Sequence, residues 1–532
     1  MDRPASTNKE FVLCFDGTGY KFRGDDTDSN VIKIYRMLDR NKPSQFHYYQ
    51  PGIGTYTTSI WQSYEAHKNR LKRWFLNTKD AAVGTTFDEH VMDGYRYLMR
   101  FYCPGDCIYI FGFSRGAYVA RMVAEMLDHI GLLEAGNEGK VGYVWNIYSQ
   151  WAKQSNSIDT EQAEKDRLYE YMKALRETFC RPVSQVRFLG LFDTVNSIPR
   201  FEVNRNKFLF PYTAKTSARV IRHAVAIDEH RAKFREDLLS DSNPNISEKE
   251  RKRRARMQGD GQLQQGHYSG EAFYRPSRRQ TVDSGDRTLT GSPRASYDAG
   301  GCSEDTSYDQ DIEEVWFAGS HADIGGGVKL DDDDECFGLS HVPLVWMVNE
   351  AQRAGLKFDP EKRKLFHCFD DSEDTYLPGA EKATGDQQET TERSQFRSAL
   401  WRAATTSRIH DFLRYGQGVA WSTVLTWKIV EYLPLRRMGL QEDGSWRPVR
   451  WPVPLGERRD VPKDARVHAS AIRRMQANSN YRPDNLIRGK RWKKKCPQEY
   501  GIGTWEVYAH HGCPIRETYK KMPDTTGCSG SV

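Results

Sequence analysis

The chain has 532 residues, enough for one large catalytic domain with accessory parts, or roughly two to four domain equivalents. Hydrophobic residues make up only 38% of it and the mean hydropathy is −0.75, so part of the length is polar insertion rather than core. The 78 basic and 72 acidic residues leave a net charge of +6, which gives no reason to expect nucleic acid but is compatible with a basic face toward anionic lipid.

Cysteine usage and hydropathy indicate the compartment. Ten cysteines are too sparse for a disulfide framework in a chain of this length, so we expect reduced thiols. Residues 1–10 are polar, which predicts no signal peptide, and no apolar run reaches the length of a membrane span. The sequence therefore predicts a cytoplasmic protein, with peripheral membrane contact left open and the oligomeric state undetermined.

Short apolar runs alternate with stretches of helical periodicity along the first two thirds of the chain. The predicted strands cover residues 11–15, 107–111, 183–192 and 315–318, and the predicted helices cover residues 80–100 and 117–133. Each predicted strand is followed closely by polar residues. This alternation predicts an open α/β fold with a mostly parallel sheet flanked by helices and a site at the carboxyl ends of the strands.

Two polar stretches interrupt this pattern. Residues 241–310 lack apolar periodicity, which predicts a disordered low-complexity insertion, and residues 379–395 predict a shorter flexible loop. The catalytic domain is therefore expected in two parts, residues 1–240 and 311–378. Residues 396–532, rich in Trp, Arg and Pro, predict a C-terminal accessory or cap region.

The segment Gly112-Phe113-Ser114-Arg115-Gly116 lies between a predicted strand and a predicted helix. This is the layout of a nucleophile elbow, in which two glycines allow a tight turn that holds a serine hydroxyl exposed beside a base. The pattern also occurs by chance in a chain with 42 glycines, but the strand before it and the helix after it favour function. Ser114 is the candidate nucleophile.

Asp193 and His321 follow Ser114 in the order serine, acid, histidine that α/β-hydrolases use. Each follows a predicted strand, and His321 precedes three glycines. Alone, either residue would more often be structural; together they predict a triad in which His321 is the general base and Asp193 orients it, with an acyl-enzyme that water hydrolyses. Asp323 is a second candidate acid, although its position favours bracing of the histidine loop.

The developing oxyanion of such a reaction needs two hydrogen-bond donors. One is expected to be the backbone N–H of Arg115, which follows the nucleophile. The other is expected from a neighbouring strand-end loop, for which Gly17 and Thr18 are the candidates. Asp16 is expected to support the shape of that loop.

Several motifs in order resemble the α/β-hydrolase family of the type VI secretion phospholipase effectors and their fungal relatives. They are Phe15-Asp16-Gly17-Thr18, Ser29-Asn30-Val31, Gly112-Phe113-Ser114-Arg115-Gly116-Ala117, Leu191-Phe192-Asp193-Thr194-Val195, His321-Ala322-Asp323-Ile324-Gly325-Gly326-Gly327, and the segments 224–234 and 339–355. The resemblance covers most of residues 10–360 outside the insertion. It implies a Ser-Asp-His esterase, with phospholipase activity in the characterised bacterial members. Residues 427–437 and 466–475 resemble the fungal branch, for which the resemblance supplies no substrate.

Two segments could meet a lipid interface. Residues 418–435 contain Trp421, Trp427 and Tyr432, although a helix packed on the sheet is the commoner explanation for such a pattern. The basic run 488–495 is compatible with anionic headgroups or a nuclear import signal, and most simply with a solvated charged loop.

We predict no metal and no cofactor. Residues 331–334 are four consecutive aspartates, which lack the alternating ligand spacing of a calcium loop and predict an exposed acidic turn. His510, His511 and Cys513 have no paired partner at zinc-site spacing.

Two functions therefore compete. The first is a serine hydrolase of carboxylic esters, acting on a phospholipid or another acyl lipid. The second is a catalytically silent scaffold that keeps the fold and binds partners through its insertion and C-terminal region. The ordered Ser114, Asp193 and His321 favour the enzyme, because a scaffold has no need of these side chains at strand ends.

Overall fold

The computed structural model describes residues 8–53, 80–155, 162–195, 218–239, 310–329, 337–368, 387–435, 437–440, 446–487 and 501–522. The predicted insertion and the acidic run 331–334 lie outside these ranges, apart from Gln310, and so does the basic run 488–495. No helix in the described ranges combines the length and the apolar character that a bilayer-spanning segment needs.

A nine-stranded sheet forms the centre of the molecule, in the order β12-β13-β11-β8-β7-β6-β3-β1-β2. All neighbours from β2 to β11 pair in parallel, and the last two pairs at the other end are antiparallel. The strands are β1 Glu10–Phe15, β2 Gln45–Gln50, β3 Cys107–Phe113, β6 Phe188–Phe192, β7 Val220–Ala226, β8 Asp311–Phe317, β11 Arg466–His468, β12 Trp505–Ala509 and β13 Thr518–Lys521. Two small pairs, β4 Leu132–Leu133 with β5 Cys180–Arg181 and β9 Arg437–Leu440 with β10 Trp446–Val449, lie apart from it.

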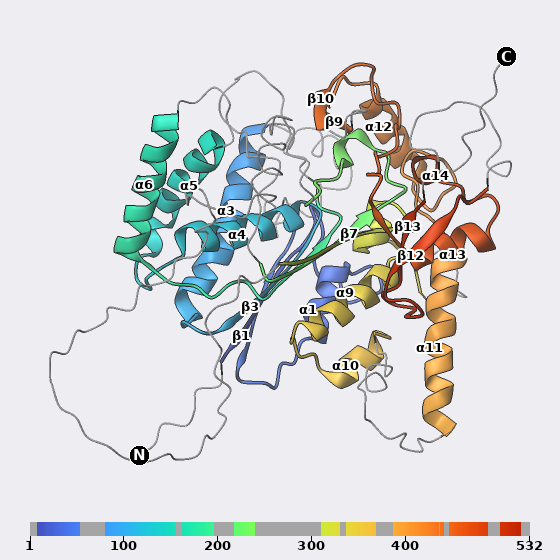
Figure 1. Cartoon of the computed structure of the whole chain (residues 1–532), viewed down its shortest axis with the longest axis horizontal. Helices are drawn as coiled ribbons and strands as arrows, with labels where there is room; N and C mark the ends of the chain where they lie inside the picture. The colour runs from blue at the N-terminus through green and yellow to red at the C-terminus, as the bar shows by residue number, and fades with distance from the viewer. Residues whose placement is uncertain are drawn as a thin grey trace, which may run out of the picture.

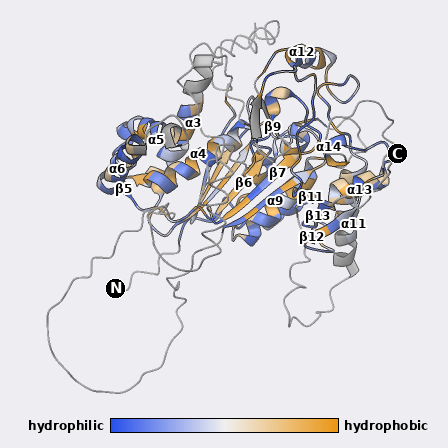
Figure 2. Ribbon diagram, turned by 45° about the horizontal axis from the view of Figure 1, so that its top comes forward, coloured by the Kyte–Doolittle hydropathy of each residue, from blue (hydrophilic) through white to orange (hydrophobic). Residues whose placement is uncertain are grey.

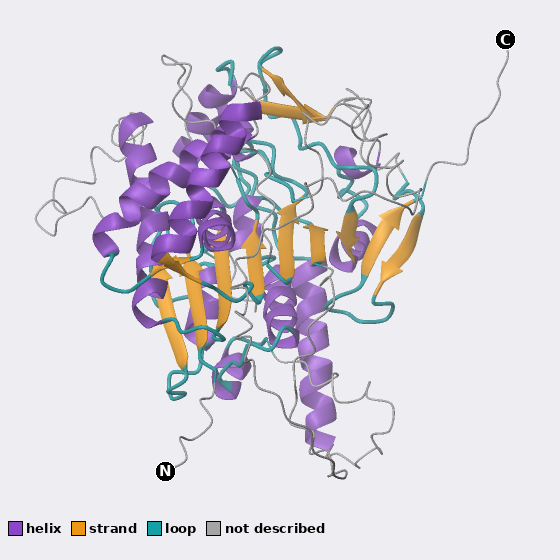
Figure 3. Cartoon of the chain, turned by 60° about the vertical axis from the view of Figure 1, so that its left-hand side comes forward, coloured by secondary structure: helices purple, strands orange, loops and turns teal. Residues whose placement is uncertain are grey.

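Helices cover both faces of this sheet. The helices of the described ranges are α1 Asn30–Met37, α3 Asp80–Phe101, α4 Arg115–Ile130, α5 Val141–Ser155, α6 Gln162–Phe179, α8 His321–Gly325, α9 His341–Arg353, α10 Pro360–Leu365, α11 Gln387–Thr405, α12 Trp421–Glu431, α13 Ala469–Ala477 and α14 Asp484–Ile487, with short 3₁₀ turns η2 Glu138–Lys140 and η3 Ala232–Phe234. Helices α3 to α6 lie on one side of the sheet, and α1 and α9 lie on the other (Figure 1). The strands form a row between these layers (Figure 3).

The alternation of side chains along the parallel strands explains the two covered faces. In β1, Phe11, Leu13 and Phe15 join the core under α3 and α4, while Val12 and Cys14 join the core under α1 and α9. Successive strand residues point to opposite faces, so a strand buried on both sides reads as a continuous apolar run. The mostly parallel α/β fold predicted from these runs is confirmed.

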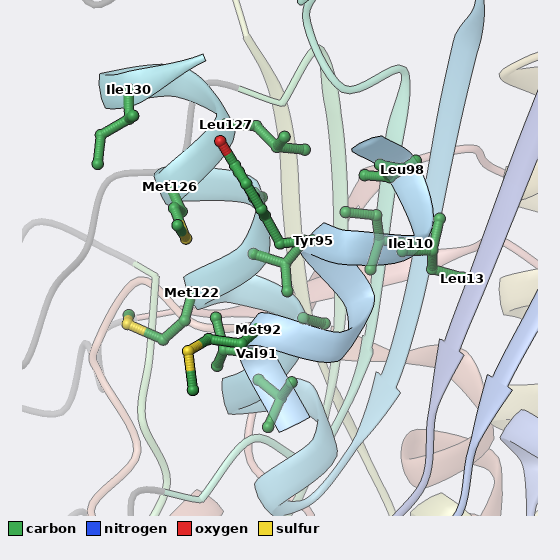
Figure 4. Close-up of a cluster of buried hydrophobic side chains, with 14 of the residues drawn as sticks. Leu13, Val91, Met92, Tyr95, Leu98, Ile110, Met122, Met126, Leu127 and Ile130 are labelled. Carbon is green, nitrogen blue, oxygen red and sulfur yellow. The ribbon is translucent and has the colours of Figure 1, made fainter. Parts of the chain in front are cut away.

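The buried side chain of Tyr95 connects α3 to the segment between the end of α4 and β4. It extends from α3 toward α4, on the side of Met126 and Leu127 (Figure 4). Its hydroxyl donates to the carbonyl of Gly131 and accepts from the N–H of Leu133, both at 2.9 Å. The polar group of this buried tyrosine is therefore satisfied at the end of α4.

Helix α4 starts earlier than the predicted Ala117, and it ends at Ile130, beside the Gly131 near which we expect the helical face to end. It begins at Arg115, directly after Ser114, and Gly131 follows it with a φ of 79°, a conformation that few other residues adopt. Leu132 and Leu133 then form β4. Strand β6 covers only the last five residues of the predicted strand 183–192.

The C-terminal region extends the central sheet. Strand β11 pairs in parallel with β8 through the register Arg466 to Val315, and β13 and β12 continue the sheet from there. Buried residues of α13 pack on this end of the sheet with Trp316 and Val225. The composition of this region predicts an accessory or cap region but no strand of the central sheet, because strands that pair over such a sequence separation leave no local signal.

Part of the loop predicted at residues 379–395 is helical. Residues 379–386 lie outside the described ranges, and residues 387–395 form the first half of α11. The stretch is polar, but its Gln, Glu and Arg residues favour helix, and the composition by itself did not distinguish a solvated helix from a loop.

Candidate active site

Ser114 lies on a strained turn between β3 and α4. Its φ is 59° and its ψ is −124°, and its N–H still donates to the carbonyl of Phe192 at 3.0 Å as a continuation of the sheet. Glycine is required on both sides of the serine, at positions 112 and 116, because neighbouring backbone atoms leave no room for a side chain. A Cβ on Gly112 would lie 2.4 Å from the Cα of Ala117, and one on Gly116 would lie 2.4 Å from the carbonyl oxygens of Phe15 and Asp16.

His321 is the first residue of α8, which follows β8. Asp323 Oδ2 accepts the backbone N–H of Ser320 at 2.9 Å at the start of this short helix, so Asp323 has a structural role there. The helix packs tightly: a Cβ on Gly325 would lie 2.0 Å from the ring of Phe113. The His321 ring lies 4.8 Å from that same ring, measured between centroids.

The three strand ends bring Ser114, Asp193 and His321 together. His321 Nε2 lies 2.8 Å from Ser114 Oγ, and His321 Nδ1 lies 2.5 Å from Asp193 Oδ2. Ser114 and His321 are each 4% exposed and Asp193 is fully buried. Burial outweighs the influence of Asp193 and holds the pKa of His321 below its usual value, so the ring is neutral and able to accept a proton.

Asp193 is held from three directions. Its φ is 42°, its Oδ1 accepts the N–H of Ala226 at 2.8 Å, and its two oxygens accept the guanidinium of Arg459 at 2.6 and 2.9 Å. Burial by itself would raise the pKa of this carboxyl. Arg459 and the hydrogen bond with His321 outweigh burial, so the pKa of Asp193 lies well below its usual range.

A second buried ion pair supports the histidine. Glu229 forms a bidentate pair with Arg231 at 2.9 and 2.7 Å, and its Oε2 also accepts the backbone N–H of His321 at 3.2 Å. Although burial raises the pKa of Glu229, Arg231 lowers it to about 2. The carboxylate therefore stays ionised and fixes the start of α8 at any ordinary pH.

An aromatic wall covers the histidine on its outer side. The Phe234 ring meets the His321 ring at 4.7 Å in a T-shaped contact, and Trp427 of α12 meets Phe234 at 5.3 Å in the same way. The Arg231 guanidinium carbon lies 3.8 Å from the centroid of Phe234 and 4.1 Å from that of Phe412. Helix α12 thus contributes to a closed cover over the site.

The loop after β1 runs beside the elbow, because β1 and β3 pair with Phe15 opposite Gly112. Asp16 shapes this loop: it accepts hydrogen bonds from its neighbour Gly17 at 2.7 Å and from the hydroxyls of Ser29 and Tyr49 at 2.9 Å. Burial raises the pKa of Asp16 to about 6.

The donor groups near Ser114 are not equally available. The Gly17 N–H is engaged by Asp16, whereas the backbone N–H groups of Thr18 and Arg115 have no acceptor in the described part of the chain. The Thr18 hydroxyl is also buried without a partner. A buried hydroxyl without a partner carries a cost of about 1–3 kcal/mol, which a hydrogen bond to a bound oxygen atom would remove.

The remaining predicted residues lie elsewhere. Asp323 accepts from His410 Nδ1 at 2.7 Å and does not contact the His321 imidazole among the described hydrogen bonds. His510 lies 3.4 Å from Glu313 Oε1. Within the described ranges, no group of three or more His, Cys, Asp or Glu side chains is placed to hold a metal ion.

Sequence reasoning missed Arg459 and gave no role to Glu229, Arg231 or Glu236. Arg459 is one of 78 basic residues and lies 266 positions after Asp193, so no local pattern identified it. Glu229 and Arg231 fall in the segment 224–234 that resembles the family, which is the only signal that could have drawn attention to them.

Comparison with known proteins finds a matching family model and a number of relatives. The family model described as T6SS, phospholipase effector Tle1-like, catalytic domain matches residues 9–350. An uncharacterized protein of Saccharomyces cerevisiae is 27% identical over 566 residues, covering 91% of this chain and 81% of the yeast protein.

Two solved structures are more distant. An uncharacterized protein from Pseudomonas aeruginosa is 17% identical with a TM-score of 0.31; the match covers 75% of this chain and 53% of that one, so this chain spans about half its length. The Tle1 effector bound to the VgrG spike of the type VI secretion system is 14% identical with a TM-score of 0.29, covering 76% of this chain and 85% of the effector.

Proposed function

Because the chain belongs to the family of the type VI secretion Tle1-like phospholipase effector catalytic domains, we propose that it is a serine hydrolase that cleaves carboxylic ester bonds of phospholipids. The observation that carries the proposal is the continuous contact from Ser114 Oγ through the imidazole of His321 to Asp193, at 2.8 and 2.5 Å. A neutral buried imidazole between a serine and an ionised aspartate is the arrangement that general-base catalysis requires.

In the proposed reaction, Ser114 Oγ attacks the ester carbonyl carbon while His321 Nε2 takes its proton. The tetrahedral intermediate collapses, the ester C–O bond breaks, and the departing alcohol oxygen receives the proton from His321. Water then attacks the acyl-Ser114 ester, again losing a proton to His321, and the fatty acid leaves as Ser114 recovers its hydrogen. Asp193 keeps the imidazole in the required tautomer throughout.

We assign the oxyanion donors to the backbone N–H groups of Arg115 and Thr18, with the Thr18 hydroxyl as a third donor. The support is that these groups lack partners, whereas the Gly17 N–H already donates to Asp16. Donors that wait unpaired beside the nucleophile stabilise developing charge without reorganisation.

We further propose that the enzyme meets the lipid surface through α12. Its outer face exposes Trp421, Leu425, Ile429 and Tyr432, which recur at helical spacing, whereas Val424, Trp427 and Val430 are buried on its inner face. The helix lies at the edge of the molecule, beyond the ends of the sheet (Figure 2). Aromatic side chains beside basic ones, here Lys428, suit a headgroup boundary.

Because Ser114 and His321 are almost fully buried, an acyl chain needs the cover over them to open. Trp427 connects the exposed face of α12 to Phe234 and so to the histidine. Insertion of the outer face into lipid would draw α12 away from the site.

We also propose that the protein is cytoplasmic. The support is that the six cysteines in the described ranges are all free thiols, as is usual in a reducing compartment.

The test of the proposed function is hydrolysis by the wild type and by Ser114→Ala. The wild type should release fatty acid from phospholipid vesicles, hydrolyse a soluble short-chain ester, and label with a fluorophosphonate probe. Ser114→Ala should lose all three activities while it keeps its fold. Equal labelling of the mutant would overturn Ser114 as the nucleophile. No hydrolysis of any ester by the wild type would instead favour the catalytically silent scaffold.

A further inference from the structure

Arg459 reaches the candidate site from the C-terminal region, in the connection between β10 and β11. It is 1% exposed, and its guanidinium donates to both oxygens of Asp193, at 2.6 and 2.9 Å. A planar guanidinium and a planar carboxylate joined by two parallel hydrogen bonds fix each other's orientation, which a single hydrogen bond does not.

The rest of the guanidinium is also held. Its Nε donates to the carbonyl of Phe234 at 3.1 Å and lies 3.3 Å from Glu236 Oε2, and its Nη1 donates to the carbonyl of Ala226 at 3.2 Å. Arg459 is thus tied to the loop that carries Phe234 as well as to the end of β7. The carboxylate of Asp193 is consequently fixed by groups from three separate parts of the chain.

We propose that Arg459 is a positioning residue for the triad acid: its two hydrogen bonds set the plane of the Asp193 carboxylate so that Oδ2 faces His321 Nδ1, and its charge limits how strongly that carboxylate draws a proton onto the imidazole. The inference rests on the proposed function, since it concerns the same site. It also extends the functional unit beyond residues 9–350, the part that matches the family model.

The charges around the imidazole define the expected effect. Asp193 and Glu229 favour protonated His321, while Arg231 and burial oppose it; Arg459 opposes it too, by neutralising Asp193. Glu236 lies on the far side of Arg459, and burial raises its pKa to about 7. Removal of the Arg459 charge should therefore raise the pKa of His321.

Two substitutions in the full chain separate charge from geometry. Arg459→Lys keeps a charge but loses the fork, so kcat for a soluble ester should fall by about 10²-fold through misplacement, with the acid limb of kcat/KM near the wild-type pH. Arg459→Gln loses both, so kcat should fall and the acid limb should move to higher pH. In each variant KM should change little, because Arg459 touches no substrate.

The matched control is Arg474→Lys. Arg474 is another buried arginine of the C-terminal region, and it donates to the backbone carbonyls of Ala404 and Ser407 rather than to the site. This control should lower thermal stability without moving the pH profile or the kcat of the folded enzyme.

An NMR titration of His321 in the wild type and in Arg459→Gln provides a readout that needs no activity. A higher imidazole pKa in the variant supports the proposal even if the wild type hydrolyses no ester, an outcome that would count against the proposed function alone. An unchanged imidazole pKa, a wild-type kcat in both variants, or loss of cooperative unfolding in both would overturn the positioning role.

Discussion

The ring of Trp427 meets the ring of Phe234 edge to face at 5.3 Å, and Phe234 in turn meets His321 at 4.7 Å. Trp427 lies on the buried face of α12, and the opposite face of this helix is exposed. The ring contacts therefore connect His321 to a helix that also has an exposed apolar face. Binding at a lipid surface and access to the serine are therefore expected to be linked through α12.

Substitution on the outer face of α12 tests that link. Ile429→Ser should reduce vesicle binding and vesicle hydrolysis by roughly 10-fold or more, because the variant loses roughly 1.5–3 kcal/mol of apolar burial when the face inserts. Hydrolysis of a soluble short-chain ester should not change. Vesicle co-sedimentation and fatty-acid release measure the two effects.

A matched control for this change is Leu365→Ser on α10. Leu365 is 68% exposed and Ile429 is 57% exposed, but α10 lies far from α12 in the fold (Figure 1). Equal loss of vesicle binding in both variants would contradict a specific lipid-facing role for α12.

The elbow glycine Gly116 is expected to tolerate no side chain. A Cβ would lie 2.4 Å from two backbone carbonyl oxygens, and a backbone position in the sheet moves little to relieve such a contact. Gly116→Ala should therefore abolish ester hydrolysis and lower the melting temperature. Gly139→Ala, whose Cβ would meet nothing within 4 Å, should keep both near wild-type values.

The pH profile should place the acid limb of kcat/KM below 6.5. Burial lowers the pKa of His321 from its ordinary value of 6.5, so the imidazole becomes neutral, and active as a base, at a lower pH than a free histidine does. Activity on a soluble ester should fall only as the pH drops through that lowered pKa. A limb centred clearly above 6.5 would show that burial does not dominate the environment of His321.

Loss of the Thr18 hydroxyl should affect the transition state more than substrate binding. Thr18→Val keeps the shape and the backbone N–H but removes the buried hydroxyl, so kcat should fall by up to about 10²-fold with KM nearly unchanged. Thr18→Ser retains the hydroxyl and should recover most of the loss. A kcat of Thr18→Val equal to that of the wild type would leave the oxyanion to backbone donors alone.

Much of the fold was predictable from local pattern. Buried parallel strands read as apolar runs, so β1, β3 and β8 were found from the sequence, and α3 from its helical spacing. Helix α1 and strand β2 were not predicted; β2 is half-buried and mixes polar with aromatic residues, so it contains no apolar run. The sheet position of β11 depends on pairing with a strand some 150 positions earlier, for which no short pattern exists.

The sequence by itself determined which residues end the strands: Ser114, Asp193 and His321 stand at strand ends because apolar runs stop there, and glycines follow or flank two of them. Only the tertiary structure decided how these residues are held. The Asp193 carboxylate is oriented by Arg459 from the far end of the chain, and His321 is covered by Phe234 and Trp427. Hydrogen bonds and ring contacts act over a few ångströms in space, whatever the separation along the chain, so they exist only once the sheet has brought its distant segments together.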